Sequence, residues 1–188
     1  MNRKLWTLLS INSLMVISGN LLGPLFAIFV SSFNATAFQV SVSWATMIIA
    51  GLLTSVVVSR FIGDSTRRSV GLVTAGYVIS AFAWLAYIAV DNIPQLLIVQ
   101  VFLGVGLAIG TAPFQALFAE HLDKGKHIHD YADKQIISKV IEFSAVLAGG
   151  AILTLFGFDV LFMIMSLLTL LAAIIMAGLP RTFFEGKS

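Results

Sequence analysis

The chain has 188 residues, of which 59% are hydrophobic, 11% are charged and none is cysteine. Soluble domains carry roughly 25% charged residues, so the composition excludes an ordinary soluble domain and a disordered chain. The net charge of +2 is too small an excess for binding a nucleic-acid backbone, and the missing cysteines exclude a disulfide framework or a thiol nucleophile. The remaining class is an integral membrane protein, whose first partner is the lipid bilayer.

Six stretches are long and apolar enough to cross a bilayer as helices, which takes about 20 residues each. They cover approximately residues 5–30, 38–58, 69–90, 94–118, 135–156 and 160–179, with a cytoplasmic loop at 120–134. The first stretch is too long for a signal peptide, so we expect an uncleaved span. Backbone groups in hydrocarbon must be satisfied within the chain, and no alternation typical of barrel strands is present. The sequence therefore predicts an all-α membrane protein that forms one six-span domain over residues 1–188.

The basic residues determine the predicted orientation, because Lys and Arg concentrate in cytoplasmic loops. The opposite connections carry only Asp91 and Asp159 as charged residues. The connections and tails on the side of the N-terminus hold ten basic residues: Arg3, Lys4, Arg60, Arg67, Arg68, Lys124, Lys126, Lys134, Arg181 and Lys187. We therefore expect both termini to be cytoplasmic and the protein to be a multi-pass protein of the cell (inner or plasma) membrane.

Two pairs of spans resemble each other along the chain. The segment GPLFAIF at 23–29 aligns with APFQALF at 112–118, and Ala50-Gly51 aligns with Ala148-Gly149. A second copy of three spans would begin on the other side of the membrane, which gives a 3+3 inverted repeat of the kind found in secondary transporters. Chance likeness between apolar helices is the alternative. Glycine and proline in these spans indicate close helix packing or helices that bend along a pathway.

Three motifs resemble the major facilitator superfamily. The segments AGGAIL at 148–153 and FGF at 156–158, followed by Phe162, resemble the fifth and sixth spans of that family. Leu96, Gln100 and LGVGLA at 103–108 are similar to its fourth-span motif, and RFIGDSTRR at 60–68 resembles the signature of the loop after span two. The resemblance covers the whole chain, and it implies one six-helix half, of N-terminal type, of a twelve-span transporter. It also implies a substrate site between two such halves near the midplane.

Two departures from the family pattern bear on mechanism. Gln100 stands where the fourth-span motif has an arginine, and only Asp64 and Arg68 match the loop signature directly. The resemblance still implies a cytoplasmic latch between helices, formed by Asp64, Arg67 and Arg68 through charge-assisted hydrogen bonds. An ordinary positively charged loop is the alternative.

Lys139 and Glu142 are the two ionisable residues inside the predicted spans, and ionisable groups there are candidates for function. Their spacing predicts an ion pair on one helix face, which either anchors the fifth span or faces a cavity. The midplane has no carboxylate, so we expect no proton relay and a neutral, weakly polar or amphipathic substrate. The candidate cavity residues are Asn20, Trp44, Gln100, Gln115 and Glu142; hydrogen bonding between helices is the alternative for the polar ones.

The sequence predicts a transporter and no enzyme, because no nucleophile–base pair or nucleotide-binding motif is present. His127-x-His129 has the ligand types for a metal, but a hydrated loop is the preferred interpretation, and we expect no catalytic residue, metal or cofactor. We predict transport of a small organic solute by a homodimer or by a pair with a second six-span half. The alternatives are a non-transporting membrane scaffold or assembly partner, and a fragment of a twelve-span parent.

Overall fold

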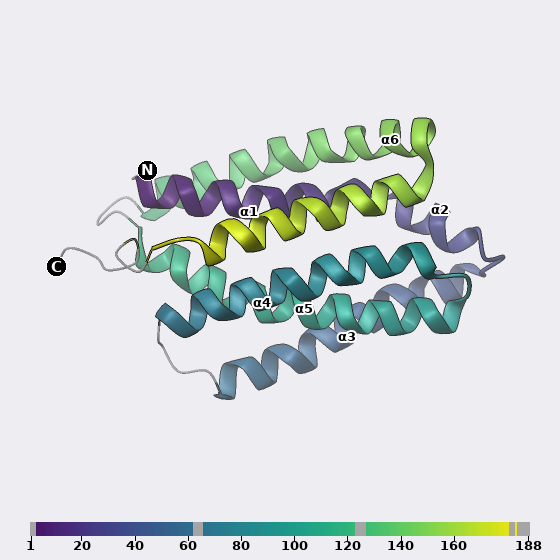
Figure 1. Ribbon diagram of the computed structural model, residues 1–188, viewed down its shortest axis with the longest axis horizontal. Coiled ribbons are helices and arrows are strands. Elements are labelled where there is room, and N and C mark those ends of the chain that lie inside the picture. Colours follow the sequence, from purple (N-terminus) through teal and green to yellow (C-terminus); the bar gives the residue numbers. More distant parts are fainter. Residues whose placement is uncertain (1–2, 62–65, 123–126, 181–182, 184–188) are drawn as a thin grey trace.

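The computed structural model describes residues 3–61, 66–122, 127–180 and 183. Within these ranges the chain is helical and contains no β-strand. The helices are α1 (Arg3–Leu22), α2 (Leu25–Ser31), α3 (Ala37–Phe61), α4 (Thr66–Ala86), α5 (Ile93–Glu120) and α6 (His127–Ala177), with a short 3₁₀ turn at Tyr87–Ala89. They lie side by side as an elongated bundle (Figure 1).

Five of these helices, α1, α3, α4, α5 and α6, are long and apolar enough to cross a membrane. The helix α6 consists of two arms, because Gly157 has a φ of 83° and a ψ of −179°. This backbone conformation is accessible essentially only to glycine, and the chain reverses direction there (Figure 1). The two arms match the predicted fifth and sixth spans, so the bundle contains six helical segments for crossing the bilayer.

The first predicted span, 5–30, is divided in the structure. The helix α1 ends at Leu22 and α2 begins at Leu25, so Gly23 and Pro24 separate them. Proline has no backbone N–H to continue the helical hydrogen bonding, which gives the break its physical reason. Pro113, by contrast, lies buried inside the continuous helix α5.

The predicted loop at 120–134 is shorter in the structure, because α6 already begins at His127. Asp130 lies in the first turn of α6, where a negative charge is favoured by the helix dipole. Tyr131 and Lys134 of the same segment contact the ring of Phe118 on α5. The part of the segment from 127 onward is therefore helix that packs on the bundle.

Glycines bring the helices into close contact. A Cβ atom on Gly76 of α4 would lie 2.6 Å from the carbonyl oxygen of Gly106 and from the amide nitrogen of Gly110, both on α5. A Cβ on Gly104 would overlap the carbonyl of Met47, and one on Gly149 would overlap the carbonyl of Leu21. Small residues thus set the distances between α4 and α5, α3 and α5, and α1 and α6, as is typical of helix contacts in membranes.

The two ends of the bundle differ in chemistry. The basic end holds Lys4, His121 and Lys134; the Lys4 ammonium lies 5.9 Å from the ring centroid of Phe183, and the His121 ring stacks on Phe183 at 6.4 Å. The aromatic end holds the rings of Phe29, Tyr87, Phe158 and Phe162; the centroids of Phe29 and Phe162 each lie 5.0–5.9 Å from those of the other three rings. The start of α1 and the end of the second arm of α6 both lie at the basic end (Figure 1).

One buried polar contact joins α1 to the second arm of α6 between these ends. The hydroxyl of Ser18 donates to the carbonyl of Met165 at 2.8 Å, and the Thr169 hydroxyl lies 2.7 Å from the Ser18 oxygen. Both Ser18 and Thr169 are fully buried. The Thr169 hydroxyl also lies 2.8 Å from the carbonyl of Met165, so this cluster satisfies both hydroxyl groups within the apolar interior.

Candidate solute-binding site

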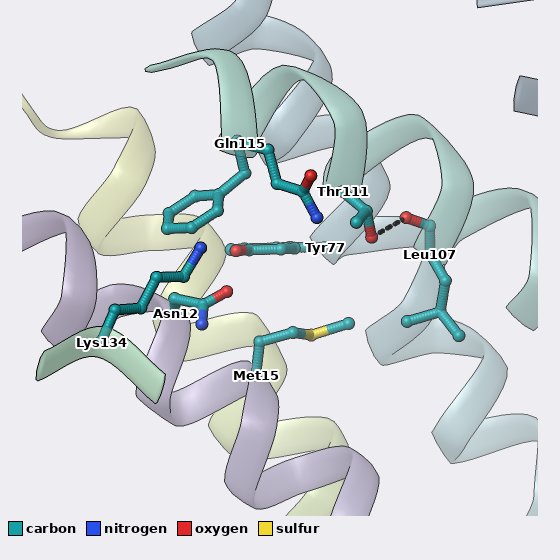
Figure 2. A pocket seen from close by; sticks show the side chains of 8 residues that line it. Asn12, Met15, Tyr77, Leu107, Thr111, Gln115 and Lys134 are labelled. Carbon is teal, nitrogen blue, oxygen red and sulfur yellow. Dashed lines mark hydrogen bonds between the residues drawn. The ribbon is translucent and has the colours of Figure 1, made fainter. Parts of the chain in front are cut away.

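A cavity of about 210 Å³ opens beside the core of the basic end. Four helices contribute to its wall, namely α1, α4, α5 and the first arm of α6. The lining residues are Asn12, Met15, Tyr77, Leu107, Thr111, Phe114, Gln115 and Lys134. Figure 2 shows that the side chains of Asn12, Gln115 and Lys134 are arranged around the ring of Tyr77.

Lys134 carries the charge of this cavity. Its ammonium nitrogen lies 4.4 Å from the ring centroid of Phe118, 5.7 Å from that of Phe114 and 5.9 Å from that of Tyr131. The negative faces of aromatic rings attract a cation at such distances. Within the part of the chain that the structure describes, Lys134 has no carboxylate within ion-pair distance. Among the described residues, the contacts of this half-buried ammonium group are therefore with aromatic rings.

The neutral polar groups of the cavity differ in whether they already form a hydrogen bond within the protein. The Thr111 hydroxyl donates to the carbonyl of Leu107, four residues earlier, at 2.7 Å (Figure 2). The amides of Asn12 and Gln115 make no hydrogen bond within the described ranges. Each amide has two donors and an acceptor, so the cavity offers free hydrogen-bonding groups next to a cation.

Toward the aromatic end, two further cavities are mostly apolar. An open groove of about 440 Å³ lies between α2 and α3, and a smaller cavity of about 100 Å³ lies between α1, α3, α4 and α5. Trp44 lines both, and its ring meets that of Phe26 edge-on at 5.0 Å. These spaces lack a charged lining residue.

The five predicted cavity residues do not share one site. Gln115 lines the cavity at the basic end and Trp44 lines those toward the aromatic end. The Asn20 amide donates to the carbonyl of Val16 in its own helix at 2.8 Å, and the Glu142 carboxylate lies 2.6 Å from the Lys139 ammonium. Asn12 is the α1 amide that lines the same cavity as Gln115.

Gln100 is fully buried, and neither atom of its amide has a hydrogen-bond partner among the described residues. The same holds for the Ser80 hydroxyl and for the indole nitrogen of Trp84, both on α4. A buried polar group without a partner is costly. Gln100 lines none of the three cavities described above.

The predicted latch is only partly visible. Asp64 lies outside the described residues, whereas Arg67 and Arg68 lie exposed in the first turn of α4. The described part of the chain therefore leaves the latch as a prediction.

Two lining residues, Lys134 and Tyr77, are not among the predicted cavity residues. Lys134 lies in the predicted loop at 120–134. The spacing of Tyr131 and Lys134 by three residues is a signal for Lys134, because residues at this spacing share a helix face. Because α6 begins at His127 and not at residue 135, Lys134 lies on a helix that packs against the bundle.

The fold and the cavity define a polytopic helical membrane protein. Its bundle contains a cavity lined by amide groups and an ammonium group. The chain matches the Major Facilitator Superfamily over residues 8–185. It therefore belongs to this superfamily of membrane transporters, as a half or a fragment of the usual architecture. Comparisons with curated proteins and with solved structures gave no match.

Proposed function

We propose that this protein transports a small neutral or amphipathic organic solute across the cell membrane, with both termini in the cytoplasm. The family supports transport in general. The observation that carries the proposal for this chain is the cavity at the basic end, with its unpaired amides and its ammonium group. Lipid tails cannot satisfy such groups, whereas a solute and an opposing protein wall can.

We further propose that the opposing wall comes from a second copy of the chain, or from a separate six-span half, and that each bundle is a 3+3 inverted repeat. Thr111 and Gln115 line the cavity and are exposed on the surface of the single bundle. A partner bundle placed over them would close the cavity toward the lipid. Rocking of one bundle against the other would then expose the solute to alternate sides.

The lack of cysteine allows a direct test of the homodimer. In a Thr111→Cys variant, we expect mild oxidation in native membranes to give a disulfide-linked dimer. The matched control is Ile174→Cys, since Ile174 is exposed on the second arm of α6, which contributes no residue to the cavity. Equal cross-linking of both variants would contradict the proposed orientation. Failure of both would leave the separate six-span half as the partner.

Transport itself is tested with proteoliposomes. We expect vesicles that contain the protein to take up at least one member of a panel of labelled organic solutes faster than empty vesicles. A Gln115→Leu variant should slow this uptake, because it removes a free amide from the cavity. Absence of uptake, together with co-purification of an unrelated membrane enzyme, would favour the alternative of a non-transporting scaffold.

A further inference from the structure

The cavity at the basic end has an unbalanced charge. Of its eight lining residues, Lys134 is the one with a charged side chain, and no lining residue is acidic. Elsewhere on α6, Lys139 pairs with Glu142 at 2.6 Å. The two lysines thus lie five residues apart on one helix, and one is neutralised while the other faces a cavity.

The surroundings of Lys134 restrict how its ammonium can be satisfied. The rings of Phe114, Phe118 and Tyr131 lie on its surface at 4.4–5.9 Å, and rings cannot accept all three N–H bonds of an ammonium group. Among the residues that the structure describes, this half-buried cation has no counter-ion, so an anion that reaches it would be bound favourably. The free amides of Asn12 and Gln115 can donate to the same anion.

Apolar side chains complete the lining of this small cavity. Met15, Leu107 and Phe114 contribute them, and the cavity volume of about 210 Å³ is below the roughly 300–1,000 Å³ of pockets for drug-sized ligands. A ligand that fits this wall has an anionic head and a compact apolar body.

We propose that this cavity is an anion site, in which Lys134 binds the carboxylate of a small organic acid while Asn12 and Gln115 donate hydrogen bonds to it. The inference rests on the proposed function, because it assigns the transported solute to the anionic amphipathic class. An anionic lipid headgroup shares this chemistry, so the experiment must distinguish the two sources.

The test uses benzoate as the probe with the full chain in a neutral detergent, and measures binding by calorimetry. We expect Lys134→Gln to raise the Kd for benzoate at least tenfold, and Lys134→Arg to keep it within threefold of the original because the charge remains. The matched control is Lys139→Gln, which removes a lysine of the same helix outside the cavity and should leave the Kd unchanged. Benzamide, which is uncharged, should bind at least tenfold more weakly than benzoate.

Competition with lipid identifies the source of the anion. If the solute is an organic acid, phosphatidylglycerol added to the detergent micelles should leave benzoate binding intact. If phosphatidylglycerol displaces benzoate, and if Lys134→Gln abolishes this displacement, the ligand of the site is a lipid headgroup. This result would overturn the assignment to a solute. Equal binding of benzoate and benzamide, or an equal loss in Lys139→Gln, would overturn the anion site altogether.

Failure of this inference can be separated from failure of the proposed function. Uptake of an uncharged solute that is insensitive to Lys134→Gln would overturn the anion site and leave transport standing. Benzoate binding that depends on Lys134 in a protein that moves no solute would overturn transport and leave the site.

Discussion

The two ends of the bundle use aromatic rings for different purposes. At the aromatic end, the Phe29 ring meets Phe158 at 5.1 Å and Phe162 at 5.0 Å, so rings fill the space between helices. At the basic end, Phe114 and Phe118 lie further apart, at 6.5 Å, and the ammonium of Lys134 occupies the space above them. The same side-chain type closes one end and lines a charged cavity at the other.

This difference indicates that the aromatic end contributes mainly to stability and the basic end mainly to ligand binding. Close ring contacts add dispersion and quadrupole attraction, whereas a cavity gives up such contacts. We therefore expect substitutions at the aromatic end to change the free energy of unfolding, and substitutions at the basic end to change binding more than stability. Substitutions at the two ends test this division, and two further substitutions test contacts between helices, from the largest expected effect to the smallest.

The largest effect is expected for Phe162→Ala at the aromatic end. The variant removes ring contacts with Phe29, Tyr87 and Phe158 and leaves a cavity, at a cost of about 3 kcal/mol. Titration of the purified protein with SDS measures this free energy of unfolding. The control is Phe156→Ala, since Phe156 is 63% exposed; equal destabilisation by both would show that the loss does not come from the buried ring contacts.

A second substitution tests the close contact of α1 with α6. Gly149→Ala places a methyl group against the carbonyl of Leu21, which should lower the free energy of unfolding by about 2 kcal/mol through overpacking. Gly150→Ala is the matched control, because a Cβ there meets no atom within 4 Å. The control should be neutral or stabilising in the same SDS titration, and a loss equal to that of Gly149→Ala would contradict the steric explanation.

A third substitution probes the region between the two ends. Thr169→Val keeps the side-chain shape but removes the hydroxyl that contacts Ser18 at 2.7 Å. Hydrogen bonds between membrane helices contribute roughly 0.6–1.7 kcal/mol, so we expect a loss of about 1 kcal/mol by SDS titration. Thr154→Val is the control, because its exposed hydroxyl bonds only within its own helix. A larger effect in the control would show that the Ser18 contact is not stabilising.

The smallest change in stability is expected at the basic end. Lys134→Gln removes cation–π contacts, each of which contributes about 0.5–1 kcal/mol at an exposed site. Relief of a half-buried charge opposes this loss, so thermal unfolding should shift by no more than one or two degrees. A thermal shift as large as that of Phe162→Ala, measured in the same way, would show that Lys134 supports the fold rather than a ligand.

Composition and hydropathy alone determined the class of the protein and the approximate positions of its spans. Charge-free stretches of about 20 residues have one stable form in hydrocarbon, because only a helix satisfies its own backbone groups there. The motifs at 60–68, 103–108 and 148–158 also indicated the family, which the match over residues 8–185 confirms. The sequence did not predict the end of α1 at Leu22 or the start of α6 at His127, since helix boundaries depend on local contacts.

Only the tertiary structure decided which polar side chains share a site. Asn12, Gln115 and Lys134 come from three helices, and which face each helix turns to its neighbours depends on contacts such as those of Gly76 and Gly149. These helices are apolar on all sides, so hydrophobic periodicity cannot identify their buried faces. The structure therefore brings Asn12, Gln115 and Lys134 to one cavity, although Lys134 belongs to the predicted loop at 120–134.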